Sequence, residues 1–309
     1  MKPLRELLDD YLVTRRMLGA KLEDSGRRLH HFVEYLNKHQ VEYITTERAL
    51  AWATVPQQAL PFYRARRLAE VRHFATYARA INPKHQVPPE RLLPPPCSRR
   101  QPYLYHDDDI IALMDKCHDL TGQIRPFTYA TIVGLLSVTG MRSGEVVQLN
   151  HDDVDIQQGI ITILNSKFGK SRINPCHDTT RQALAAYVIR RNEHLSGFGS
   201  NPFFVSEKGT RISTHTLRET FAKLCCSTGL RYPGQHHSPR LHDLRHRFAI
   251  KTLMQWYREQ GDMALCLPRL ATWLGHVNIS STYWYLTAIP ELMELAAHHL
   301  DHTQQGDKP

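Results

Sequence analysis

The stretch from 242 to 285 carries residue types that bind anions or act as nucleophiles, at His242, Arg245, His276 and Tyr285. His242 and Arg245 are three residues apart, so they share one face if this segment is helical. A helix over 242–257 is predicted by the apolar residues that repeat through it, which are Leu244, Phe248, Leu253 and Trp256. A histidine and an arginine in the first turn of a helix, where backbone N–H groups are unpaired, form an anion site.

His276 and Tyr285 follow later in the same segment, nine residues apart. This gap allows a short helix over 280–286 to carry the tyrosine hydroxyl back toward the same anion. A further arginine, Arg142, lies in T-G-M-R-S-G-E at 139–145. Each guanidinium is permanently charged and can grip phosphate oxygens with paired donors. These residue types therefore indicate an anion-binding site with a tyrosine hydroxyl close to the anion.

The motifs that hold these residues resemble those of the tyrosine recombinase family, the phage-integrase and Xer-type site-specific recombinases. They are T-G-M-R-S-G-E, H-D-L-R-H, L-G-H and the tyrosine nine residues after the last histidine, in family order over about the last two thirds of the chain. The resemblance implies a mainly α fold with a small β-sheet. It implies an N-terminal helical core-binding (SAM-like) domain and a C-terminal α+β catalytic domain.

The resemblance also implies which residues carry out the reaction. Tyr285 is the expected nucleophile, and because a phenol has a pKa of about 10 it needs a proton acceptor or a strongly positive site. His242 is expected to serve as that base, and His276 to donate a hydrogen bond to a phosphate oxygen. Tyr283 is the neighbouring rival, but the nine-residue spacing from His276 favours Tyr285.

Arg142 and Arg245 are expected to hold the phosphate oxygens, with Glu145 in a supporting position. A lysine in a β-hairpin is the general acid of this family and protonates the departing 5′ oxygen. Two lysines compete for this position, Lys167 and Lys170. The segment K-F-G-K-S-R-I-N-P, laid over the family's K-G-x-K-x-R-x-x-P, favours Lys167.

The chain divides into two domains around a proline-rich stretch. Residues 1–81 are predicted to form a helical DNA-binding domain, residues 82–102 an extended linker, and residues 103–309 the catalytic domain with a C-terminal helix. Within the catalytic domain we expect a hairpin with strands at 159–164 and 172–175. The remainder, to about residue 300, is predicted to be helical.

A basic balance favours a polyanionic partner, because 39 Lys and Arg stand against 30 Asp and Glu, a net charge of +9. A solvated charged face is the alternative interpretation of any single basic helix. The resemblance favours phosphate contacts along duplex DNA, which give mostly sequence-independent affinity. The residues expected to make them are Arg64, Arg66, Arg67, Arg72, Arg99, Arg100, Lys170 and Arg172.

Several other functions are disfavoured. No apolar run approaches the roughly 20 residues of a membrane span, and no signal peptide is evident, so we expect a cytoplasmic protein with reduced cysteines. Cys225, Cys226, His236 and His237 lack zinc spacing, so no metal site is expected. A phosphate-binding P-loop fails because Leu164 stands where its first glycine belongs.

The reaction implied by the resemblance is site-specific strand exchange on double-stranded DNA through a 3′-phosphotyrosyl intermediate. It needs no cofactor, and it implies a homotetramer on two duplexes. The 31 residues from Arg245 to His276 exceed the spacing of compact Xer-type members, which favours a mobile-element role. A type IB topoisomerase-like activity and a non-catalytic DNA-binding regulator are the alternatives.

Overall fold

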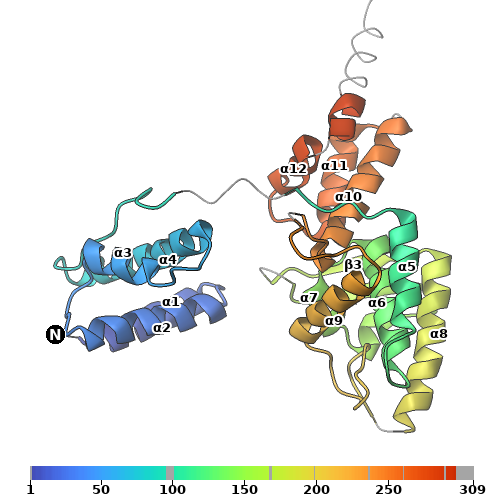
Figure 1. Ribbon diagram of the computed structural model, residues 1–309, viewed down its shortest axis with the longest axis horizontal. Coiled ribbons are helices and arrows are strands. Elements are labelled where there is room, and N and C mark those ends of the chain that lie inside the picture. Colours follow the sequence, from blue (N-terminus) through green and yellow to red (C-terminus); the bar gives the residue numbers. More distant parts are fainter. Residues whose placement is uncertain are drawn as a thin grey trace, which may run out of the picture. The chain divides into compact units, whose positions relative to one another are not determined.

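The computed structural model describes residues 2–94, 101–166, 169–197, 199–235, 237–259, 261–288 and 290–296. The chain forms two compact units, residues 1–100 and 101–309, which we describe one at a time (Figure 1). Both are built mainly from helices, and the second also contains a small sheet. The mainly α fold with a small sheet is confirmed.

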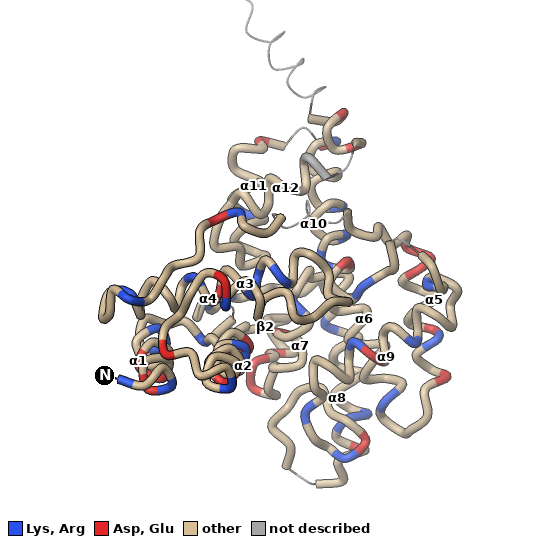
Figure 2. Tube along the Cα trace, turned by 60° about the vertical axis from the view of Figure 1, so that its left-hand side comes forward, with Lys and Arg blue, Asp and Glu red and all other residues tan. Residues whose placement is uncertain are grey.

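Four helices make up the first unit: α1 (Leu4–Met17), α2 (Glu23–Lys38), α3 (Thr46–Thr54) and α4 (Pro61–Ile81). Apolar residues at helical spacing on each helix face one core, in which Phe32 and Phe74 are fully buried. The outer faces of α1 and α2 carry charges of both signs (Figure 2). The helical character expected for residues 1–81 therefore follows from amphipathic patterning.

The chain after α4 stays on the first unit beyond the boundary expected at residue 81. His85 is buried and its Nδ1 accepts a hydrogen bond from the Ile44 backbone N–H at 3.1 Å. The carbonyls of Pro88 and Pro89 accept from Arg72, both at 2.8 Å. Prolines cannot donate, yet their carbonyls still accept, so the start of the predicted linker packs against the helices.

The arginines of α4 that are expected to contact DNA also make contacts within their own unit. Arg64, Arg67 and Arg72 donate to backbone carbonyls of the same unit, namely those of Pro56 and Gln57, Trp52, and Pro88 and Pro89. Arg67 also lies over the Trp52 ring, with Cζ 3.7 Å from the ring centroid. These three side chains hold loops to the helix, and their expected contact with DNA stays a prediction. Arg66 is exposed and pairs with Glu70 at 3.2 Å, while Arg99 and Arg100 lie outside the described residues.

The second unit begins with three helices and a three-stranded antiparallel sheet of order β1-β2-β3. The helices are α5 (Asp107–Cys117), α6 (Arg125–Thr139) and α7 (Ser143–Gln148), and a 3-10 turn, η1 (His151–Asp153), precedes the sheet. The strands are β1 (Val154–Asp155), β2 (Ile160–Ile163) and β3 (Arg172–Pro175), with Ile163 opposite Arg172. The predicted hairpin is present, and β1 adds an edge strand that was not expected.

Five further helices follow in this unit: α8 (Asp178–Leu195), α9 (Thr214–Ser227), α10 (Leu241–Arg258), α11 (Met263–Leu274) and α12 (Ser280–Ala288). Residues 290–296 are also helical. Helix α10 belongs to two hydrophobic clusters. Its first turn packs Leu241 and Leu244 with α5, α6 and the sheet, and its second half packs Leu253 with α11 and α12. The polar residues early in α10 therefore lie where the two clusters meet.

None of the described helices is long and apolar enough to cross a membrane. Across the same described ranges, no group of three or more His, Cys, Asp or Glu side chains is arranged to hold a metal ion. Five cysteines in those ranges are free thiols, Cys117, Cys176, Cys225, Cys226 and Cys266.

Candidate active site

The site starts at the turn between α6 and α7. Helix α6 ends at Gly140, whose φ of +63° is the left-handed conformation that favours glycine at a helix C-terminus. Arg142 is the N-cap of α7, and its backbone N–H donates to Glu145 Oε2 at 2.8 Å. This capping fixes the Arg142 backbone and turns the Glu145 carboxylate toward the arginine side chain.

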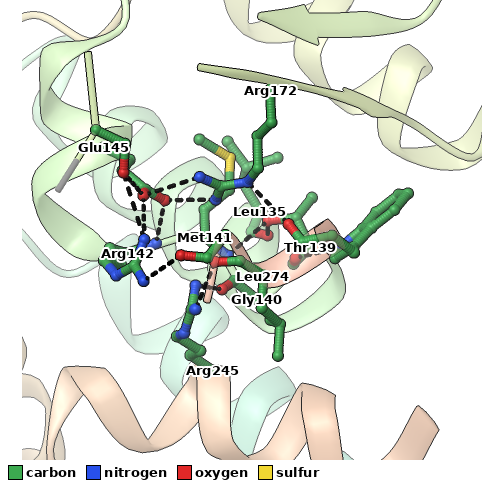
Figure 3. Close-up of polar contacts among 12 residues, drawn as sticks. Leu135, Thr139, Gly140, Met141, Arg142, Glu145, Arg172, Arg245 and Leu274 are labelled. Atoms are coloured by element: carbon green, nitrogen blue, oxygen red, sulfur yellow. Dashed lines mark hydrogen bonds and ion pairs between the residues drawn. The ribbon is translucent and has the colours of Figure 1, made fainter. Parts of the chain in front are cut away.

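The Glu145 carboxylate is the centre of a buried ionic network (Figure 3). Arg142 Nη1 donates to it at 2.7 Å, Arg172 Nη1 and Nη2 at 3.0 and 2.7 Å, and Ser166 Oγ at 2.5 Å. Burial alone would raise the pKa of Glu145, but the hydrogen bonds and charge of Arg172, with Ser166 and the Arg142 N–H, lower it to about 2. Glu145 is therefore an anion at neutral pH and orients both arginines.

Arg172, which is expected to contact DNA, is bound within the site. Its guanidinium is shared between Glu145 and the Trp273 carbonyl, which accepts from Nε at 2.8 Å, and its side chain is only 10% exposed. The residue thus acts inside the site rather than on its surface. Ser166, which the sequence did not single out, joins the same network and fixes the hairpin loop next to position 167.

Three successive carbonyls at the end of α11 each accept from a different arginine. Arg172 binds the Trp273 carbonyl, Arg245 Nη2 binds the Leu274 carbonyl at 2.6 Å, and Arg142 Nη2 binds the Gly275 carbonyl at 2.9 Å. The last carbonyls of a helix are unpaired and carry its negative dipole end, so they attract cations. The end of α11 thus gathers guanidinium groups from the turn before α7, from β3 and from α10 (Figure 3).

Arg245 is the most deeply placed of these cations, with 2% of its surface exposed. Its Nη1 also donates to the Gly140 carbonyl at 2.7 Å, so it links the end of α6 to the end of α11. Burial, and then the nearby charge of Arg142, lower the pKa of Arg245 to about 10. The group is still charged at neutral pH, and an anion beside it would meet an incompletely solvated cation.

Gly275 can be tested as the position that lets the arginines approach. Its φ is +66°, and a Cβ there would lie 2.9 Å from Arg172 Nη1. We expect Gly275→Ala to lower the free energy of unfolding by at least about 1–2 kcal/mol, from left-handed strain and displacement of Arg172. Gly144→Ala is the control, because no atom lies within 4 Å of its Cβ and helical alanine is favoured over glycine. Equal urea midpoints for the two variants would contradict this role of Gly275.

His242 lies in the first turn of α10 with its side chain exposed. The packing of protein around its ring, followed by the positive charges of Arg245 and Arg142, lowers the pKa of His242 to about 4. It is therefore uncharged at neutral pH. Its ring meets the edge of His246, one turn later, at a centroid distance of 4.7 Å.

Tyr285 lies on α12 with 2% of its surface exposed, whereas Tyr283 is 48% exposed. The His276 ring is nearly parallel to the Tyr285 ring, with centroids 6.4 Å apart, and His276 Nδ1 lies 2.8 Å from Thr282 Oγ1. The histidine within hydrogen-bond distance of the Tyr285 hydroxyl is His246, whose Nδ1 is 3.1 Å away. The sequence analysis did not single out His246.

The structure thus brings Arg142, Arg245, Glu145, His242, His276 and Tyr285 into one region of the second unit. Lys167 lies outside the described residues, and Lys170 is exposed in the hairpin loop, where its carbonyl accepts from the Ser166 N–H at 2.8 Å. Two guanidinium groups, a neutral histidine and a phenol suit the binding of a tetrahedral oxyanion and its attack by oxygen.

Comparison with known proteins agrees with this geometry. Residues 103–291 match the model of the phage integrase family. A putative integrase/recombinase, y4rB, of Sinorhizobium fredii strain NGR234 is 42% identical over 307 residues, which cover 97% of this chain and 98% of that protein. The tyrosine recombinase XerC of Pseudomonas savastanoi pv. phaseolicola is 29% identical over 221 residues, covering 72% of this chain and 68% of XerC.

Solved structures show the same fold at low sequence identity. The Tn1549 transposon integrase, in complex with transposon right end DNA, matches with a TM-score of 0.68 and 14% identity over 97% of this chain and 99% of the other. The XerH site-specific recombinase, in a pre-cleavage complex with its difH substrate, matches with a TM-score of 0.61 and 19% identity over 90% and 79%. The family match and the near full-length relative lead to one conclusion: the chain belongs to the phage integrase family of tyrosine recombinases and is an enzyme of that class.

Proposed function

We propose that this enzyme catalyses site-specific DNA strand exchange through a covalent 3′-phosphotyrosyl intermediate formed on Tyr285. The observation that carries the proposal is the position of Tyr285 beside His276, with ring centroids 6.4 Å apart, because His276 directly follows the Leu274 and Gly275 carbonyls that bind Arg245 and Arg142. A phenolic nucleophile beside two guanidinium groups suits attack on a phosphate. Double-stranded DNA is the proposed partner, in keeping with the difH substrate and the transposon end DNA bound in the two similar structures.

In the proposed cleavage step the Tyr285 oxygen attacks a backbone phosphorus and the 5′ oxygen leaves. Arg142 and Arg245 stabilise the charge that builds on the nonbridging oxygens, and Glu145 holds Arg142 in place. His276 donates to a phosphate oxygen, and Lys167 protonates the departing 5′ oxygen. The free 5′ hydroxyl of a partner strand then attacks the phosphotyrosine, so one phosphodiester replaces another and no ATP is required.

The proposed contacts to the DNA backbone are the basic residues named from the sequence: Arg64, Arg66, Arg67, Arg72, Lys170 and Arg172, with Arg99 and Arg100, which lie outside the described residues. Strand exchange between two duplexes needs four active sites, so we propose a homotetramer assembled on DNA. Lambda integrase, which has a similar fold, has been solved as a tetramer bound to a Holliday junction. We also propose that the enzyme belongs to a mobile genetic element. A relative named integrase/recombinase and the similar fold of a transposon integrase support this proposal.

The segment after Pro290 is also part of the proposed assembly, with two alternatives: it packs against a neighbouring protomer, or it covers its own domain. Leu292 is fully buried against its own unit, with Leu295 and Ala296 partly buried in the same cluster, which favours the second alternative for these residues. Met293 is 55% exposed and is the side chain that a neighbouring protomer could contact.

The experiment has two stages because the target sequence must first be found. A library of randomly nicked DNA duplexes is incubated with the protein, and detergent then removes the DNA that is bound without a covalent bond. The DNA that stays attached to the protein is recovered and sequenced. Two plasmids carrying the recovered site are then mixed with the wild type, Tyr285→Phe or Tyr283→Phe. We expect recombinant plasmids with the wild type and Tyr283→Phe, and none with Tyr285→Phe. Relaxation of supercoils without recombinants would instead favour a topoisomerase-like enzyme, and binding without a covalent product a regulator.

A further inference from the structure

His246 contacts the proposed nucleophile directly. Its Nδ1 lies 3.1 Å from the Tyr285 hydroxyl oxygen, within hydrogen-bond distance. The two residues come from different helices, α10 and α12, and their rings form a T-shaped pair at a centroid distance of 5.5 Å. Tyr285 is buried and His246 half-buried, so this contact lies inside the site.

Two features make this position suited to proton transfer. His246 directly follows Arg245, a buried cation, in α10. The His246 ring also contacts two other rings, that of His242 at a centroid distance of 4.7 Å and that of Trp284 at 5.4 Å. A general base must lie about 2.6–3.2 Å from the atom whose proton it accepts. The distance from His246 to the phenol lies in this range, and the neighbouring rings fix the orientation of the imidazole.

We infer that His246 is a catalytic residue that accepts the Tyr285 hydroxyl proton as the phenolic oxygen attacks phosphorus. The inference rests on the proposed function and specifies its first step. The Oη–H bond breaks and its proton passes to Nδ1, while an oxygen lone pair forms the O–P bond. The bond from phosphorus to the 5′ oxygen breaks, and that oxygen takes a proton from the general acid. The reverse reaction returns the proton from His246 to Tyr285.

The other candidate base, His242, is less suited on two physical grounds. It contacts the ring edge of His246, whereas His246 is the one at hydrogen-bond distance from the phenol. Its pKa of about 4 makes it a weak base, and a weak base gives little driving force for removing a proton from a phenol. His242 remains suited to contact a phosphate oxygen from its exposed position.

A purely structural role for His246 makes a different prediction, because a buried hydroxyl needs a hydrogen-bond partner of any kind. The side chain of asparagine places an oxygen close to the position of Nδ1 but is not basic. His246→Asn therefore keeps a partner for the phenol and removes the base. His215→Asn is the matched control, since His215 lies on α9 with 81% of its side chain exposed and pairs with Glu219.

The test measures the rate of covalent adduct formation on a nicked duplex that carries the recovered site. We expect His246→Asn to slow the reaction by about 100-fold or more with DNA affinity unchanged, and His215→Asn to match the wild type. A second duplex carries sulfur at the bridging 5′ position, which departs without protonation. We expect it to leave His246→Asn slow, because the missing group acts on the nucleophile.

Two results would overturn the inference: a His246→Asn rate within about threefold of the wild type, or full restoration of its rate by the sulfur substrate. If His246→Asn does not fold, the test uses His246→Gly with added imidazole. A rate of adduct formation that rises with imidazole concentration would support the inference, and an unchanged rate would overturn it. Failure of the wild type to form any adduct would instead reject the proposed function itself.

Discussion

Arg245→Lys is expected to slow covalent adduct formation by about 100- to 1000-fold, the loss typical of removing a preorganised donor from a developing oxyanion. Lysine keeps the charge but cannot reproduce the guanidinium fork that reaches both the Gly140 and Leu274 carbonyls, 2.7 and 2.6 Å away. Because Arg245 is almost fully buried, one of these carbonyls would lose its partner and the remaining cation would shift. The rate is measured on the nicked site duplex under single-turnover conditions.

Arg181→Lys is the matched control for this effect. Arg181 lies on α8 and pairs with Asp178 at 2.6 Å, with 37% of its side chain exposed, so the change keeps a charge at the surface. We expect its rate to match the wild type. An Arg245→Lys enzyme as fast as Arg181→Lys would show that the guanidinium geometry at the end of α11 does not contribute to the reaction.

Glu145→Gln is expected to lower the free energy of unfolding of the second unit at pH 7 by about 3 kcal/mol. The pKa of Glu145 is about 2 in the folded chain and about 4.5 for an ordinary glutamate, and each pKa unit corresponds to about 1.4 kcal/mol. The variant leaves the guanidinium groups of Arg142 and Arg172 buried without their anion, which is costly. Urea unfolding provides the measurement.

The same substitution has a defined pH dependence. Because folding lowers the pKa of Glu145, its stabilising contribution is complete above about pH 4.5 and disappears as the pH falls through about 2. The stability gap between wild type and Glu145→Gln should therefore narrow from pH 5 toward pH 2. Glu219→Gln, at an exposed position 61% accessible, should change stability by at most about 0.5 kcal/mol. A gap that stays constant with pH would contradict the ionic role of Glu145.

Helices and strands with strong periodicity were predictable from sequence alone. The helix expected at 242–257 is α10, Leu241–Arg258, and the expected hairpin strands contain β2 and β3. These elements can be predicted locally, because apolar residues at helical spacing face a core together only in a helix, and alternating apolar residues do so only in a strand. The two-residue strand β1 was missed, since so short a segment has no periodicity to detect.

The roles of basic side chains were less predictable. Arg64, Arg67 and Arg72 fall on a basic helix in a pattern that fits phosphate contact, yet each donates to a carbonyl from another loop of its own unit. Arg172 lies in a strand of the predicted hairpin, but its partner, Glu145, is 27 residues earlier in the chain. Contacts between distant segments depend on tertiary packing, which no local spacing reveals.

His246 shows where a local signal was present and overlooked. It lies four residues after His242, so on a helix the two rings share a face, and it directly follows the arginine of the motif. Its contact with Tyr285, 39 residues later, depends on how α12 packs against α10. Ser166 had no comparable signal, because a serine in a turn is usually explained by local hydrogen bonds.

The most direct measurement identifies the amino acid that becomes bonded to DNA. The wild-type protein is incubated with the nicked site duplex, the adduct is digested with protease and nuclease, and the modified peptide is sequenced by tandem mass spectrometry. The account predicts a nucleotide attached through its 3′ phosphate to Tyr285, with a free 5′ hydroxyl on the released strand. A nucleotide on Tyr283 or any other residue, a 5′-phosphate linkage, or the absence of a covalent peptide would contradict it.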